Sequence, residues 1–165
     1  MGYNTDWDGQ LKTNRAFTKE ELTYWNTEIR DTRHDDELHQ YGDPNRIMPS
    51  IWCGFMIENR TTNWGEKYGV FFWDGGEKTY MGRKWIEFFL NKLHEWSTKG
   101  EEIYAEGEME WDGEESNDLG RVVVEKCIAQ GGVLMHVDAV EFRYNRKHTT
   151  VVNPLKPKES YTLKE

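Results

Sequence analysis

Cysteine and proline are scarce in this chain, which has two cysteines and four prolines among 165 residues. Neither Cys53 nor Cys127 belongs to a CxxC pair, and both lie in apolar, strand-like runs. We therefore expect two reduced, buried cysteines, and we exclude a disulfide scaffold. Long apolar runs are also lacking, and none approaches the length that crosses a bilayer.

The chain has no excess of positive charge, because its formal net charge is -9. This balance disfavours nucleic acids and anionic membranes as partners and favours a protein with a basic surface. The first ten residues are polar, so we predict no signal peptide and a cytoplasmic protein. Phosphate-binding loops, nucleophile elbows and Cys–His signatures are lacking too, and this favours a role without catalysis.

Aromatic residues, by contrast, are abundant, with eight Trp, eight Tyr and seven Phe. They supply enough buried area for one domain of this length. We assign residues 1–145 to a single domain. Residues 146–165 are basic at first and contain proline, so we predict a C-terminal tail there, whose residues 149–152 can still pair at a sheet edge.

The tripeptide Trp-Asp-Gly occurs three times, at residues 7–9, 73–75 and 111–113. Asp-Gly is a strong turn signal, because Gly adopts positive φ freely and Asp tolerates it. Each copy follows a strand-like stretch. We therefore expect each copy to mark the end or interruption of an antiparallel strand, with an aromatic ring beside the turn.

Two helices are predicted from apolar spacing and capping residues. Thr18 and Glu21 form a capping box at the start of the first, which we expect to end near Arg33. The second covers residues 80–98. Its apolar face repeats at helical spacing and contains Trp85, Ile86, Phe89, Leu90, Leu93 and Trp96.

Strands are predicted at residues 3–14, 51–57, 68–73, 102–111, 121–129 and 133–144. Residues 51–57 are apolar on both faces, so we place that strand in the centre of the sheet. The order is β-α-β-β-α-β-β-β. This order predicts an α+β fold, with an antiparallel sheet of about six strands and two helices packed on one face.

A row of acidic residues is the most informative chemical feature of the sequence. Between residues 101 and 118 there are nine acidic residues and no basic one. Strand alternation places Glu106, Glu108, Glu110 and Asp112, with Tyr104, on one face, about 6.7 Å apart along the strand. Such a row can contact a basic protein surface or hold a hard cation. It is also what the solvated face of a one-sided sheet looks like.

Other candidate sites are weaker. His34, Asp35, Asp36, Glu37 and His39 are metal-ligating residue types, but their spacing matches no known zinc pattern. The turn residues Asp74, Glu77, Glu114 and Asp118 offer carboxylate pairs of the kind that hydrolases use, although turn chemistry explains them equally well. The aromatic residues Trp7, Trp64, Tyr80 and Tyr104 are not all needed by the helical faces and can contact a nucleobase or a partner.

Five segments of the chain resemble, as a set, a group of small proteins from tailed phages and from bacteria that carry mobile elements. The segments are residues 2–6, 28–33, 49–53, 73–78 and 107–115. This resemblance extends over roughly residues 2 to 130. It implies a phage or mobile-element origin and implies no particular activity.

Three hypotheses follow. The first is a phage accessory protein, made in the host cytoplasm, that binds and modulates a host protein without catalysis. In that hypothesis Glu106, Glu108, Glu110 and Asp112 form the contact row, and Tyr104 is an aromatic anchor. The second is a protein that sequesters a small nucleotide or signal molecule in an aromatic pocket. The third is a metal-dependent hydrolase that uses the same acidic residues.

Overall fold

The structure is a computed structural model that describes residues 4–34, 48–76, 79–98, 101–115, 118–127, 132–141 and 144–152. Its strands are β1 (Thr5–Thr13), β2 (Phe55–Thr61), β3 (Lys67–Trp73), β4 (Ala105–Gly113), β5 (Leu119–Cys127), β6 (Gly132–Glu141) and β7 (Tyr144–Val152). Its helices are α1 (Lys19–Thr23), which continues as the π-helical η1 (Tyr24–Ile29), and α2 (Gly82–Trp96).

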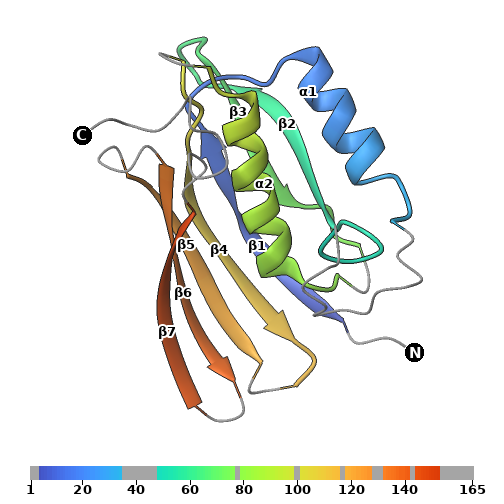
Figure 1. Cartoon of the computed structure of the whole chain (residues 1–165), viewed down its shortest axis with the longest axis vertical. Helices are drawn as coiled ribbons and strands as arrows, with labels where there is room; N and C mark the ends of the chain where they lie inside the picture. The colour runs from blue at the N-terminus through green and yellow to red at the C-terminus, as the bar shows by residue number, and fades with distance from the viewer. Residues whose placement is uncertain are drawn as a thin grey trace.

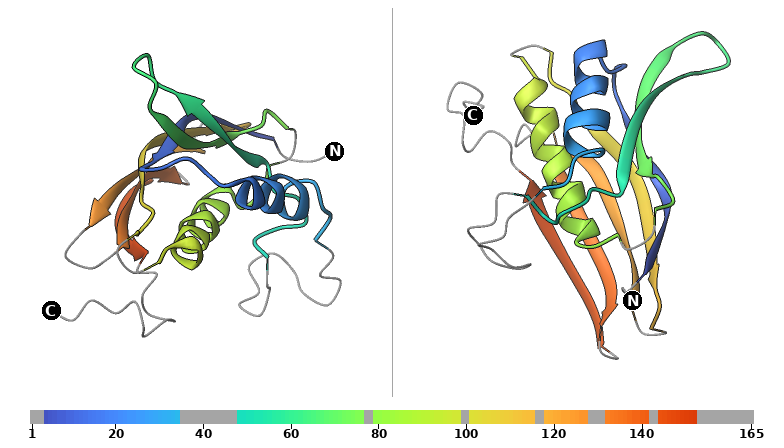
Figure 2. Two further views of the ribbon diagram at one scale, coloured as in Figure 1. Left: turned by 90° about the horizontal axis from the view of Figure 1, so that it is seen from above. Right: turned by 90° about the vertical axis from the view of Figure 1, so that its right-hand side faces the viewer.

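All seven strands form one antiparallel sheet in the order β2-β3-β1-β4-β5-β6-β7. Both helices lie on one face of this curved sheet (Figures 1 and 2). The predicted α+β class is therefore confirmed. Strand β1 lies inside the sheet, between β3 and β4, and pairs with β4 along its whole length, from Thr5 opposite Gly113 to Thr13 opposite Ala105.

The sheet has one strand more than predicted, because residues 146–152 of the expected tail belong to β7. This strand pairs with β6 from Glu141 opposite Tyr144 to Val133 opposite Val152. The basic composition of the segment suggested a tail, but backbone pairing does not depend on side-chain charge. The remaining tail residues, 153–165, lie outside the described part of the chain.

The central position predicted for residues 51–57 is wrong, because β2 is an edge strand and residues 51–54 precede it. Helix η1 covers this edge. The Asn26 side chain donates to the Ile57 carbonyl at 2.8 Å and accepts from the Ile57 N–H at 3.1 Å. Trp25 Nε1 donates to the Phe55 carbonyl at 3.1 Å. An apolar strand can thus lie at an edge, because a helix satisfies its outer backbone groups.

Two copies of Trp-Asp-Gly end strands as predicted, since β3 ends at Trp73 and β4 at Gly113. The first copy does not, because it lies inside the continuous strand β1. Gly9 has a φ of +93°, and a Cβ atom there would overlap with the carbonyl of Glu108 on β4. This glycine is needed for close approach between neighbouring strands rather than for a turn.

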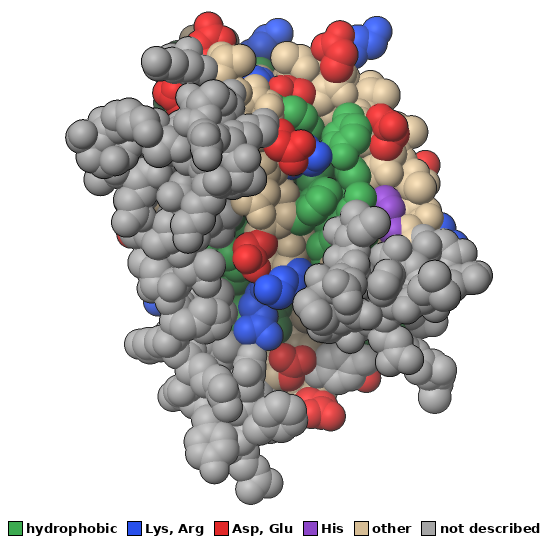
Figure 3. All heavy atoms as spheres, viewed as in Figure 1, with side chains coloured by type: hydrophobic (Ala, Val, Ile, Leu, Met, Phe, Trp, Pro, Cys, Tyr) green, Lys and Arg blue, Asp and Glu red, His purple; other side chains and the backbone are tan. Residues whose placement is uncertain are grey.

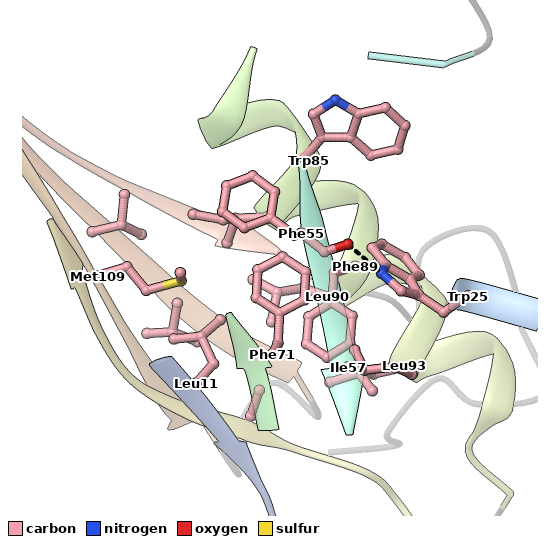
Figure 4. Close-up of a cluster of buried hydrophobic side chains, with 14 of the residues drawn as sticks. Leu11, Trp25, Phe55, Ile57, Phe71, Trp85, Phe89, Leu90, Leu93 and Met109 are labelled. Carbon is pink, nitrogen blue, oxygen red and sulfur yellow. Dashed lines mark hydrogen bonds between the residues drawn. The ribbon is translucent and has the colours of Figure 1, made fainter. Parts of the chain in front are cut away.

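Aromatic side chains from the helices and the sheet build the core (Figure 4). Phe71 stacks on Phe55 at 5.0 Å and on Phe89 at 4.2 Å between ring centroids. Trp25 packs edge-on against Phe89 at 5.4 Å. Five of the six predicted apolar residues of α2 are buried, namely Trp85, Ile86, Phe89, Leu90 and Leu93. The capping box of Thr18 and Glu21 is confirmed as well.

Candidate functional site

The predicted acidic row lies on the outer face of the sheet, opposite the helices. Glu106, Glu108, Glu110 and Asp112 are all exposed, while the alternating Ala105, Met109 and Trp111 are buried. The predicted alternation along β4 is therefore confirmed. The four carboxylates are exposed, and none of them lines the cleft described below.

Cations of the same molecule approach part of this row. Arg121 on β5 donates to Glu108 at 3.0 Å, and its Cα lies opposite that of Glu110. Lys12 on β1 lies directly opposite Glu106. The end of the row that contains Glu106 and Glu108 is thus largely balanced by neighbouring positive charge.

The other end of the row is reinforced by a second strand. Asp6 on β1 lies opposite Asp112, and Asp8 lies opposite Glu110. We call these four exposed residues the acidic patch. Like charges directly opposite each other on neighbouring strands lower the stability of a sheet. Sequence reasoning missed Asp6 and Asp8, because it treated the first Trp-Asp-Gly as an interruption of the strand.

Tyr104 is less exposed than the acidic residues that follow it. It precedes β4, is half-buried and packs against the hydrophobic core. Its N–H donates to Asn14 Oδ1 at 2.9 Å. Burial, and after it the charge of Glu102, raises the pKa of its hydroxyl group. Its predicted role as an aromatic anchor stays a prediction, for a ring that packs partly against the core.

The weaker candidates have structural partners where they are described. His34 Nε2 lies 2.7 Å from the Ile29 carbonyl, and the other four residues of its cluster lie outside the described residues. Asp74 pairs with Arg30 at 3.5 Å, whereas Glu77 is not among the described residues. In the part of the chain that the structure describes, no three His, Cys, Asp or Glu side chains gather closely enough to hold a metal ion.

Cys53 is buried and free, as predicted. Desolvation raises the pKa of its thiol to about 12, because the charged thiolate is disfavoured away from water. The side chain of Cys127 lies outside those that the structure describes. Cys53 is thus a small core residue rather than a nucleophile.

A second candidate site lies on the opposite face of the sheet, where the first turn of α2 meets β1 and β4. It is a cleft of about 600 Å³, which we call the α2 cleft. Small-molecule sites are of this size, about 300–1,000 Å³. The residues that line the α2 cleft include Thr5, Trp7, Met81, Arg83, Lys84 and Trp111.

Two tryptophans form the floor of the α2 cleft. Trp7 and Trp111 lie opposite each other on β1 and β4, with ring centroids 5.4 Å apart. The Trp111 indole donates to Asp118 at 3.2 Å, which fixes its orientation. The guanidinium of Arg83 lies over the Trp111 ring, 5.0 Å from its centroid. One face of Trp111 thus already receives a planar, charged group.

Helix α2 begins at this floor without a side-chain cap among the described residues. The residue before it, Met81, has the left-handed conformation (φ 58°, ψ 37°) and makes no capping hydrogen bond from its side chain. Gly82 follows, and a Cβ atom there would overlap with the ring of Trp7. Gly82 therefore lets the backbone of the first turn lie directly on Trp7. The strained conformation of Met81 costs about 1–2 kcal/mol.

The indole nitrogen of Trp7 is buried and has no hydrogen-bond partner within the described ranges. Trp7 is only 7% exposed. Its Nε1 lies 2.8 Å from the place that a Cβ on Gly82 would occupy, against the first turn of α2. Buried polar groups without a partner are rare, so this N–H requires an explanation.

Positive charge gathers at the mouth of the α2 cleft. Figure 3 shows a group of Lys and Arg side chains over the lower end of α2, with acidic side chains above and below it. Arg83 is half-buried, and Lys84 is exposed and lies 3.4 Å from Glu87. Both basic residues belong to the first turn of α2, where the helix dipole disfavours cations.

Comparison with protein-family models, with curated proteins and with solved structures finds no match for this chain. Within the described residues, no helix combines the length and apolar composition that spanning a bilayer requires. Function is therefore inferred from the geometry of the α2 cleft and of the acidic patch.

Proposed function

We propose that the protein binds a small molecule with a flat ring in the α2 cleft and does not act on it chemically. The observation that carries this proposal is the Trp7–Trp111 pair with Arg83 over Trp111. Aromatic floors with a few convergent polar groups are typical of small-molecule sites. Here the polar groups are Arg83, Lys84 and Thr5.

Arg83 also explains how a ring reaches Trp111, which is only 6% exposed in this structure. A guanidinium over a tryptophan contributes about 0.5–1 kcal/mol at an exposed site and about 2 kcal/mol or more when desolvated, and the half-buried Arg83 lies between these limits. A ligand ring that replaces it gains about 1–3 kcal/mol from base–aromatic stacking, which is of similar size. The displaced guanidinium then remains beside the ligand.

A thermal-shift experiment with a panel of nucleosides and nucleotides tests this proposal. A ligand at a hundred times its dissociation constant adds about 2.7 kcal/mol to the free energy of unfolding. For a chain of this length we expect the melting temperature to rise by about 5–10 °C. The rise should be lost in Trp111→Ala and kept in Trp64→Ala, which removes the exposed tryptophan of the β2–β3 turn. Equal responses of the two variants would contradict the proposal.

The acidic patch favours a second candidate function, docking to a basic protein surface. Its two like-charged pairs, Asp6–Asp112 and Asp8–Glu110, lower the stability of the sheet and so have no structural benefit. In this proposal the chain is a phage accessory protein that modulates a protein in the host cytoplasm. Charge complementarity of this kind raises the association rate and selects the partner.

Capture of partners from a host lysate tests the second candidate. The four residues of the acidic patch are changed to Asn or Gln. The control variant changes four other exposed acidic residues to Gln, and so removes the same amount of charge as the patch variant. These residues are Glu20 and Glu28 on the helical side, Glu66 and Glu115. A partner retained by the control and lost with the patch variant supports docking there. Identical capture by both variants would exclude the acidic patch as the interface.

A further inference from the structure

We infer that the ligand of the α2 cleft carries one phosphate group, held at the N-terminus of α2 by Arg83, Lys84 and the first-turn N–H groups. The ligand class is therefore a nucleoside monophosphate or a similar phosphorylated ring. This inference rests on the proposed function, because it names the class of molecule that the same cleft takes.

The first turn of α2 is arranged as an anion site. A helix N-terminus leaves four N–H groups without intrahelical partners and carries about half a positive charge. In α1, the side chain of Thr18 accepts a hydrogen bond from one of these N–H groups, and Glu20 and Glu21 supply negative charge. In α2, Met81 supplies no cap and the first turn contains no acidic residue.

Charged side chains strengthen this site. Arg83 and Lys84 add two positive charges to a turn where cations cost stability. Arg83 covers Trp111, whereas Lys84 is exposed and covers no buried residue of that turn. Lys84 already lies 3.4 Å from Glu87 and Arg83 lies over Trp111, and an anion bound at this helix N-terminus would stabilise both cations further.

The indole of Trp7 is a second feature of this site, independent of the helix N-terminus. Its N–H is buried, unpartnered among the described residues and packed against Gly82. Leaving such a donor without an acceptor costs about 1–3 kcal/mol. In the inferred complex, an anion seated on the first turn of α2 supplies the acceptor that this N–H lacks in the described part of the chain. Gly82 is what allows this approach, since any larger residue would overlap with the Trp7 ring.

The charge balance of the α2 cleft limits the ligand to one phosphate. Glu87 and Asp118 also line the cleft and offset the two positive charges. Asp118 is already bound to the Trp111 indole, and Glu87 to Lys84. A single phosphate can compete for Lys84 and Arg83. Further phosphates would lie near these carboxylates, in a chain whose net charge is already -9.

Isothermal titration calorimetry with four classes of probe tests the inference: the four common ribonucleosides, their monophosphates, their triphosphates, and inorganic phosphate. We expect at least one monophosphate to bind about tenfold to a hundredfold more tightly than its nucleoside, as a charge-assisted hydrogen bond implies. The Arg83→Gln/Lys84→Gln variant should lose this preference. The control Lys19→Gln/Lys67→Gln, which removes equal charge from exposed sites away from the cleft, should keep it.

The possible failures are distinguishable. Equal affinity for a nucleoside and its monophosphate, or tighter binding of the triphosphate, would overturn the single-phosphate inference and leave the ring-binding function standing. No binding of any nucleoside or nucleotide would overturn the proposed function itself. Inorganic phosphate that binds as tightly as every monophosphate would show an anion site without a ring site, and would also contradict the proposed function.

Discussion

Asn26 offers the sharpest test of how the helical layer is attached to the sheet. Its side chain makes two hydrogen bonds with the backbone of Ile57, one as donor and one as acceptor. These bonds close the outer edge of β2, with which no other described strand pairs. Asn26→Ala removes both bonds at once and leaves the Ile57 N–H and carbonyl to water.

The size of the effect follows from those two bonds. Each half-buried hydrogen bond contributes about 0.5–1.5 kcal/mol net, so the pair contributes about 2 kcal/mol. For a chain of this length, that loss lowers the melting temperature by about 4–8 °C. Asn26→Asp keeps the acceptor but places a carboxylate against the Ile57 carbonyl. It should therefore be as unstable as Asn26→Ala at neutral pH and recover below about pH 4, where the acid can donate.

Thermal and urea denaturation followed by circular dichroism measure these changes. Asn63→Ala, at an exposed position of the β2–β3 turn, is the matched control and should change stability by less than about 0.5 kcal/mol. An Asn26→Ala variant as stable as that control would refute the idea that helix η1 closes the β2 edge. So would an Asn26→Asp variant whose stability relative to the parent chain does not depend on pH.

Three further predictions concern ionisable groups. Burial opposes ionisation of Glu21, but hydrogen bonds from Arg15 and Thr18 outweigh it and lower the pKa of its carboxyl group. The contribution of Glu21 to the free energy of unfolding is therefore full above about pH 4.5 and is lost as the pH falls through the lowered pKa. Urea denaturation of Glu21→Gln should accordingly show a loss of about 1–2 kcal/mol at pH 7 and a smaller loss at pH 3. Asp8→Asn should stabilise the chain by about 0.2–1 kcal/mol at low salt and by less at high salt, and a loss of stability would contradict the like-charge pairing with Glu110. Cys53 should resist alkylation at pH 8 until the chain unfolds, and peptide mass spectrometry showing rapid labelling of Cys53 in the folded protein would contradict its burial.

Local patterns predicted the helices well, because caps and helical spacing are properties of neighbouring residues. Thr18 and Glu21 marked the start of α1, and Trp85 to Leu93 marked the buried face of α2. The alternation along β4 was equally clear from the sequence. Each of these features depends on residues at most a few positions apart.

Tertiary context decided what the sequence could not. Whether the apolar strand β2 lies inside the sheet or at its edge depends on Asn26 and Trp25, about thirty residues earlier in the chain. The α2 cleft joins Trp7, Gly82 and Trp111, which have no local relation. One signal was available in the sequence, since Met81 precedes and Gly82 begins a strongly amphipathic helix that has no Ser, Thr, Asp or Asn directly at its start.

Fluorine NMR of the protein labelled with fluorotryptophan tests the central claim most directly. The eight tryptophans report on separate parts of the chain, and Trp7→Phe and Trp111→Phe variants assign the two signals of the α2 cleft. On titration with the best-binding nucleoside monophosphate, we expect these two signals to shift together and the signal of the exposed Trp64 to stay in place. Unchanged Trp7 and Trp111 signals at saturating ligand would contradict binding in the α2 cleft.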